Sequence, residues 1–276
     1  MVIACRGGAD DIGKLRQQAH AALDRWAAAV AAAGGAQAVV PVGELTSQVG
    51  DWEEANGDNK AALFAGMVEA GAELPSTTPP DADVTFQDGS TATVPLISAV
   101  QAVTAIQATG SAPCPECRAM RITGARLTTG PIATSRGPAT APLWEFTIEG
   151  TAVTVTRVAI ANPITVVPPP WDSNTPPGGL RIDSAVASAD RRELTVSFTG
   201  APGTGDQPCG EDYTTEAVES DLAVVVIVIR HPHLTFGGCT AVGATRTATV
   251  SLAGAIGDRA VLEVQEGTPV PVTLAP

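Results

Sequence analysis

The stretch LAVVVIVI, Leu222 to Ile229, is an uninterrupted run of eight apolar residues, most of them β-branched. Eight residues are too few to cross a bilayer, for which a helix needs about 20. The β-branched residues of the run favour a strand. We therefore expect a buried strand in the C-terminal part of the chain.

Segments around this run alternate between apolar and polar residues, as strands with one buried face do. Turn residues recur between these segments, and no helical period is evident after Leu180. This rhythm predicts a small all-β sandwich domain over residues 180–276. The alternating apolar positions are Leu194, Val196 and Phe198, then Ala248, Val250 and Leu252, then Ala260, Leu262 and Val264.

A proline-rich segment, NPITVVPPPWDSNTPPGG, covers residues 162–179 and holds six prolines. Polyproline conformation makes such a segment a semi-rigid spacer, so we place the domain boundary here. The PPPW within it is also compatible with a ligand for a proline-reading domain, although the composition favours a plain linker.

The residues before this linker mix helical and strand patterns. GKLRQQAHAALDRWAAAVAAA, residues 13–33, predicts an amphipathic helix, and further helices are expected from Asp58 and over 97–109. Alternating segments, among them LWEFTIEG at 143–150, predict strands. We therefore expect an α+β domain over residues 13–161, an antiparallel sheet with helices packed on it.

The composition excludes one class of partner. With 16 basic and 29 acidic residues, the formal net charge is −13. Phosphate backbones repel so acidic a chain, so nucleic acid is not an expected partner. The charge also disfavours electrostatic adhesion to an anionic membrane.

Four cysteines divide evenly between the two predicted domains: Cys114 and Cys117 in the first, Cys209 and Cys239 in the second. Four cysteines allow three connectivities, and pairing within each domain is the one that does not span the linker. We expect two disulfides that act as structural staples, outside the cytosol.

The CPEC motif is also compatible with a thiol oxidoreductase and with a zinc site. A thiol oxidoreductase has its first cysteine at a helix N-terminus, whereas here a predicted helix precedes the motif and a strand follows it. Glu116, between the cysteines, would raise the pKa of a thiol. A zinc site would need two more ligands, for which His231 and His233 are the candidates. No cofactor and no metal is expected.

The N-terminal VIAC, Val2 to Cys5, resembles the end of a bacterial lipoprotein signal, with Cys5 as the lipidated residue. Residues 1–12 would then be a short tether to the membrane. The sequence departs from that pattern because no charged region and apolar stretch stand before Val2.

Acidic residues gather around a tryptophan in GDWEEANGDNK, residues 50–60. A calcium loop of the EF-hand type is excluded because Trp52 occupies a ligand position. Weak calcium binding, or carbohydrate stacking on Trp52, is the alternative to a solvated loop. The ligand-binding candidates are Asp51, Trp52, Glu53 and Glu54; no catalytic constellation is recognised, and paired carboxylates cannot be identified from sequence alone.

Three longer segments resemble an uncharacterised family of secreted or lipid-anchored proteins of high-GC actinobacteria. They are PVGELTSQVGDWEEANGDNKAALFAGMVEA, ITGARLTTGPIATSRGPATAPLWEFTIEGTAV and CTAVGATRTATVSLAGAIGDRAVLEVQEGTPV. The resemblance implies an envelope location and carries no functional residue. We expect a non-enzymatic extracytoplasmic protein that binds an envelope protein or a small ligand. The alternatives are an envelope hydrolase or carbohydrate-active protein with its site at Asp51–Glu54, and a thiol oxidoreductase.

Overall fold

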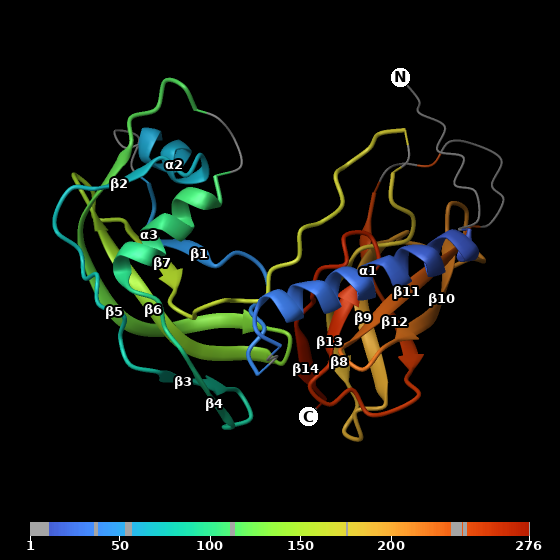
Figure 1. Cartoon of the computed structure of the whole chain (residues 1–276). Helices are drawn as coiled ribbons and strands as arrows, with labels where there is room; N and C mark the ends of the chain where they lie inside the picture. The colour runs from blue at the N-terminus through green and yellow to red at the C-terminus, as the bar shows by residue number, and fades with distance from the viewer. Residues whose placement is uncertain are drawn as a thin grey trace. The chain divides into compact units, whose positions relative to one another are not determined.

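The structure is a computed structural model and describes residues 11–35, 38–52, 57–110, 114–174, 176–232, 239 and 242–275. The chain divides into two compact units (Figure 1). Unit 1 comprises Met1–Val42, Thr134–Gly137 and Ile164–Pro276, and unit 2 comprises Gly43–Ala133 and Pro138–Pro163. No helix among the described residues has the length and apolar character that a membrane span requires.

Unit 1 contains two sheets. The three-stranded sheet has the order β10-β11-β13, with β10 and β11 antiparallel and β11 and β13 parallel. The four-stranded sheet has the order β12-β9-β8-β14. The strands are β8 (Ile182–Ala187), β9 (Glu193–Gly200), β10 (Glu211–Glu219), β11 (Ala223–Pro232), β12 (Ala244–Ser251), β13 (Ala260–Glu263) and β14 (Val272–Leu274).

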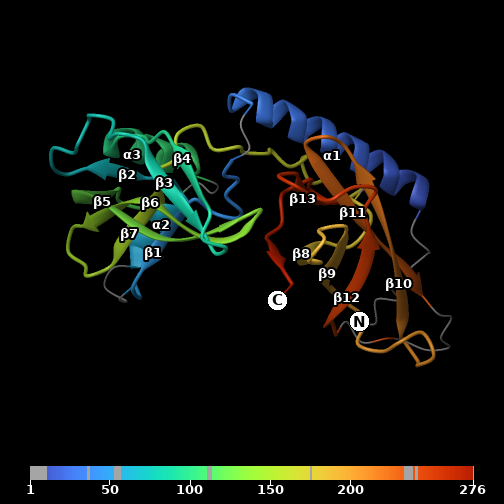
Figure 2. The same cartoon turned by 90° about the horizontal axis from the view of Figure 1, so that it is seen from below.

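The apolar run of the sequence forms β11, and both of its faces are buried. Val224, Val226 and Val228 point into a cluster shared with the four-stranded sheet. Val225 and Ile227 point the other way, into a cluster with helix α1 (Ile12–Ala32). Figures 1 and 2 both show α1 lying along β11 and β13. Unit 1 therefore has three layers: helix α1, the three-stranded sheet that contains β11, and the four-stranded sheet.

Helix α1 begins and ends where its local sequence dictates. The side chain of Asp11 caps the first turn by accepting hydrogen bonds from the N–H groups of Gly13 and Lys14. The helix stops before Gly34 and Gly35, which adopt positive φ values of 98° and 85°. Its buried side chains recur every three or four residues: Leu15, Ala19, Ala22, Leu23, Trp26 and Val30.

Unit 2 is built on one seven-stranded sheet. Strand β6 is central to this sheet because it pairs with β5, β7 and β3. Strand β1 pairs with β7, β2 with β5, and β4 with β3. The strands are β1 (Thr46–Val49), β2 (Val68–Ala70), β3 (Ala82–Phe86), β4 (Thr91–Val94), β5 (Met120–Thr134), β6 (Gly137–Ile148) and β7 (Thr154–Val158). The helices are α2 (Gly57–Phe64) and α3 (Ala99–Ala108), and α3 contacts β2 and β7.

The expected α+β fold class is wrong. Strands outweigh helices among the described residues: 41% of the residues are in strands, and there are three helices. The longest helix, predicted to cover the first sheet, packs instead against β11 and β13 of unit 1. The first sheet is also not purely antiparallel, because β2 runs parallel to β5. An amphipathic pattern shows that a helix buries one face, but it does not show which sheet receives that face.

The small β-sandwich expected for residues 180–276 is supported, because the two sheets of unit 1 share one buried cluster. Phe198 of β9, Val226 of β11 and Val250 of β12 all belong to it. The sandwich carries a helix on its outer face, which its own sequence did not indicate. A strand that is apolar on both faces has to be covered twice, and α1 supplies the second cover.

Candidate binding site

Residues 164–179, which we call the proline loop, start and finish on unit 1 (yellow in Figure 1). At the start, Ile164 is buried in the cluster that α1 forms with β11 and β13. Near the end, the side-chain amide of Gln18 donates to Gly178 O at 3.4 Å and accepts from the Gly178 N–H at 3.1 Å. The proline loop is thus held at both ends by the same helix-covered face.

Gly179 completes the second anchor because only glycine fits there. Its φ is +83°, and a Cβ at this position would lie 2.7 Å from Val264 Cγ1 and 3.2 Å from Leu15 Cδ2. The Gly179 carbonyl accepts a hydrogen bond of 2.8 Å from Gln265 Nε2. These contacts bring the loop end close to the start of α1.

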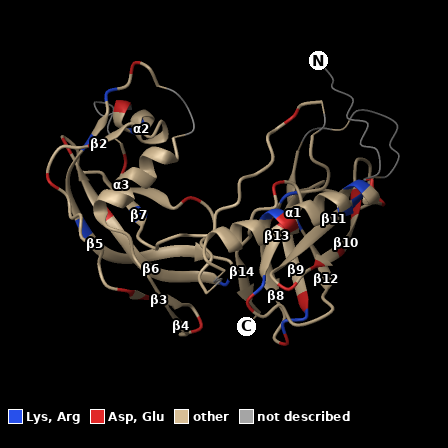
Figure 3. Cartoon of the chain, viewed as in Figure 1, with Lys and Arg blue, Asp and Glu red and all other residues tan. Residues whose placement is uncertain are grey.

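The middle of the proline loop is displayed to solvent. Trp171 is 74% exposed and Val167 is 81% exposed, and the three prolines between them are exposed too. Asp172 is the only charged residue of the loop. In Figure 3 most of the loop is therefore tan, the colour of uncharged residues. A large apolar side chain held out on an anchored, nearly uncharged segment has the character of a binding hot spot.

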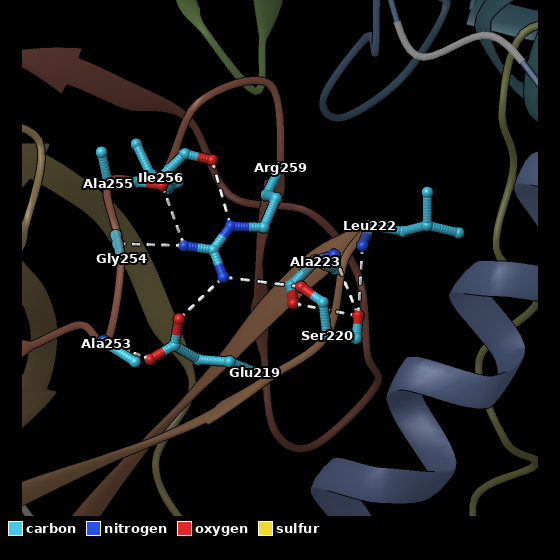
Figure 4. Close-up of polar contacts among 9 residues, drawn as sticks. All are labelled: Glu219, Ser220, Leu222, Ala223, Ala253, Gly254, Ala255, Ile256 and Arg259. Atoms are coloured by element: carbon cyan, nitrogen blue, oxygen red, sulfur yellow. Dashed lines mark hydrogen bonds and ion pairs between the residues drawn. The ribbon is translucent and has the colours of Figure 1, made fainter.

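Arg259, by contrast, belongs to a polar cluster that closes on itself (Figure 4). Its Nη1 is 2.7 Å from Glu219 Oε2, and its three nitrogens also donate to the carbonyl oxygens of Ser220, Gly254, Ala255 and Ile256. Glu219 Oε1 accepts from the Ala253 N–H at 2.7 Å. The cluster fastens the 252–259 loop to the β10–β11 turn, so its function is structural.

Glu219 shows the electrostatic consequence of this clamp. Burial by itself raises the pKa of the Glu219 carboxyl, but the hydrogen bonds from Ala253 and Arg259 outweigh it and lower the pKa below its ordinary value. The carboxylate is therefore held in its charged form by the fold.

A second structural cluster surrounds Tyr213 on β10. The Tyr213 hydroxyl accepts from the Ala201 N–H at 2.6 Å and donates to Glu211 Oε2 at 3.0 Å. Arg246 lies over the ring, 5.4 Å from its centre, and its Nη1 donates to the Ala201 carbonyl at 2.9 Å. Burial raises the pKa of Tyr213, so the phenol stays protonated and holds the loop after β9.

Glu263, at the end of β13, is buried and is likewise engaged by the backbone. Its carboxylate accepts from the N–H groups of Gln265 and Glu266 at 2.8 and 2.6 Å. These contacts close the turn that returns the chain to Pro269, which bridges to Leu262. This buried acid also has a structural function.

Arg157 differs from all of these groups. It lies on β7 of unit 2, is 7% exposed, and donates from Nη1 to Thr46 Oγ1 at 2.9 Å. Its Nε is buried without a hydrogen-bond partner, and within the described part of the chain no acidic side chain forms an ion pair with it. Burial lowers the pKa of its guanidinium.

The predicted ligand site at Asp51–Glu54 follows β1. Asp51 is exposed, Trp52 is half-buried, and the Trp52 indole N–H donates to Gln48 Oε1. Glu53 and Glu54 lie outside the described residues. The structure therefore brings Trp52 to the end of β1 but assembles no acidic cluster there from the residues that it describes.

Both predicted cysteine pairs are disulfides. Cys114 is bonded to Cys117 and Cys209 to Cys239, with Cα atoms 5.3 and 5.7 Å apart. The first closes a turn between α3 and β5, where Cys117 N–H donates to the Cys114 carbonyl. The second ties the loop before β10 to the segment after β11. Two disulfides indicate an oxidising, extracytoplasmic environment.

The histidine and lipidation candidates add little to this picture. His231 Nε2 lies 2.7 Å from Thr214 Oγ1, and His233 and Cys5 are outside the described residues. Among the residues that the structure places, no group of three or more His, Cys, Asp or Glu side chains is arranged to hold a metal ion.

Comparison with known proteins gives no relative. No family model, no curated protein and no solved structure matches the chain. The resemblance to an actinobacterial envelope family therefore remains an expectation.

Two features of the site escaped the sequence reasoning. The sequence predicts a spacer here, and it does not reveal the anchoring by Gln18 and Gln265, because both partners are distant in sequence. Arg157 did leave a signal: in AVTVTRVAIA it follows Val153 and Val155 at alternate positions. A basic residue in the apolar phase of a strand points into the core.

Proposed function

We propose that this protein acts outside the cytoplasm as a non-enzymatic interaction protein that docks on a partner protein through its proline loop. The observation that carries the proposal is the exposed pair Val167 and Trp171 on a loop anchored at both ends. The two disulfides support the compartment.

The physical basis is pre-organisation. Prolines 168–170 restrict the backbone to extended conformations before binding, so less conformational entropy is lost when a partner takes up the segment. Grooves lined by aromatic side chains receive such segments, and an exposed tryptophan adds a large apolar area at low entropic cost. The partner is therefore expected to offer an aromatic-lined groove.

A lipid on Cys5 would bring the proline loop to the membrane surface, and the resemblance of VIAC to a lipoprotein signal supports this part of the proposal. Mass spectrometry of the natural product and detergent phase partitioning test it. A water-soluble product with an unmodified Cys5 would remove lipid anchoring and leave the proline-loop proposal standing.

The docking proposal is tested by placing a photo-crosslinking residue at Val167 of the full chain and irradiating it with envelope proteins of the source organism. We expect one predominant adduct. Trp171→Ala should weaken the affinity for this partner about 30-fold or more, as loss of a hot spot of about 2 kcal/mol implies, and should lower the adduct yield accordingly. Val242→Ala is the matched control, because Val242 is 61% exposed elsewhere in unit 1. An adduct insensitive to Trp171→Ala would contradict the proposal.

A further inference from the structure

The side chain of Arg157 is charged, buried and incompletely bonded. Its exposed fraction is 7%, and its one hydrogen bond runs from Nη1 to Thr46 Oγ1. Of the remaining donors, Nε is buried without a hydrogen-bond partner. Nη2 forms no hydrogen bond within the described residues, but it is not one of the fully buried atoms. Arg25 also has an unbonded Nε, but that side chain is only half-buried.

A buried guanidinium without a counter-charge is costly, because the low-dielectric interior replaces neither its hydration nor its hydrogen bonds. Arg259 is an example of a fully bonded arginine in this chain: one carboxylate and four carbonyl oxygens accept hydrogen bonds from its three nitrogens. Arg157 is buried and Arg259 is half-buried, and yet within the described residues Arg157 has a single, neutral partner. Among the described residues, Arg157 therefore lacks the counter-charge that Glu219 gives to Arg259.

The unbonded donors have the geometry for one particular kind of anion. Nε and Nη2 project from the same edge of the planar guanidinium, and such an edge donates two parallel hydrogen bonds to the two oxygens of a carboxylate. Thr46 occupies the opposite nitrogen and leaves this edge unbonded. A carboxylate at this edge would complete the side chain.

The strands around Arg157 define the rest of the ligand. Trp144 of β6 is its cross-strand partner on one side, and Thr46 of β1 is the partner on the other. Val155, two residues away on the same face, is paired with Phe146. Trp144, Phe146 and Val155 are buried, so the surroundings of the charge are apolar and aromatic.

We propose that Arg157 is the receptor for the carboxylate of a small organic acid with an apolar or aromatic body. The bound anion accepts from Nε and Nη2, while Thr46 keeps Nη1. Because Nε has no accessible surface in the structure, side chains that cover it shift when the acid enters. This site lies in unit 2 and does not depend on the proline loop.

The experiment uses the full chain and measures the melting temperature and the heat of binding with acetate, benzoate and indole-3-acetate, against benzamide and against chloride at equal ionic strength. At about 100 times its Kd, a bound acid should raise the melting temperature by roughly 5–10 °C. We expect an aromatic acid to raise the melting temperature saturably and benzamide to leave it unchanged. In Arg157→Met the acid should no longer raise the melting temperature. Arg126→Met, at an arginine that is 72% exposed in the same unit, should keep the rise.

Two results would overturn the proposal. One is the absence of a saturable rise with all three acids, or an equal rise in Arg157→Met. The other is a loss of stability in Glu53→Gln or Glu54→Gln that is absent when Arg157 is already Met, which would assign the counter-charge to the chain itself. Crosslinking at Val167 tests the proline loop separately. Failure of one proposal can therefore be distinguished from failure of the other.

Discussion

At the scale of single residues, the arginines of this protein differ in how many of their guanidinium nitrogens have hydrogen-bond partners. Arg259 engages one carboxylate and four carbonyl oxygens, and Arg246 combines carbonyl contacts with the face of Tyr213. Both fasten loops to strands. Among the described residues, Arg157 has one neutral partner, and this contrast with Arg259 and Arg246 is the basis of the ligand proposal.

The carboxylate of Glu219 makes the stability of unit 1 sensitive to acid. Its pKa is lower in the folded protein than in the unfolded chain, so its contribution is complete above the unfolded pKa and is lost as pH falls through the folded pKa. Between about pH 5 and pH 3 the free energy of unfolding should therefore fall more steeply in the wild type than in Glu219→Gln.

At neutral pH the Glu219→Gln variant should be about 1–2 kcal/mol less stable than the wild type, because charged hydrogen bonds are weakened. Urea unfolding at a series of pH values measures both effects. Glu193→Gln, at an exposed position on β9, is the control and should change neither. Parallel pH curves for Glu219→Gln and the wild type would refute the structural function of the clamp.

At the scale of elements, the placement of α1 is the main difference between the structure and the sequence-based prediction. Periodicity predicted the helix over 13–33, and the structure has it over Ile12–Ala32. Its apolar face, however, covers β11 and β13, which lie about 200 residues later in the chain. The hairpin formed by β3 and β4 is a simpler case, because its two strands are neighbours in sequence and pair with each other.

Trp26 should be the most costly side chain of α1 to remove. It is fully buried between the helix and the three-stranded sheet, so Trp26→Ala creates a large cavity and should destabilise unit 1 by about 3–5 kcal/mol. Thermal and urea unfolding measure the loss. Val100→Ala on α3, where the side chain is 44% exposed, should cost little. Equal small effects for both would mean that α1 does not cover the sheet.

At the scale of the whole molecule, the disulfides differ in what they close. Cys209 and Cys239 are 30 residues apart, whereas Cys114 and Cys117 are three apart. Chain entropy assigns about 3.5 kcal/mol to the longer loop and about 2 kcal/mol at most to the shorter one. Cys239→Ser should therefore lower the melting temperature more than Cys117→Ser, in scanning calorimetry without reductant. The reverse order would show that loop closure does not govern their contributions.

Local chemistry along the sequence determined much of this protein. The apolar run at Leu222–Ile229, the alternation in the strands around it, the amphipathic helix and the within-domain cysteine pairs all follow from neighbours in the chain, whose periodicity and spacing are legible without a fold. Only the tertiary structure decided which sheet α1 covers, where the proline loop is anchored, and that Arg157 has no carboxylate partner within the described residues. Those facts depend on contacts between residues far apart in sequence, and no local pattern encodes the choice among distant partners.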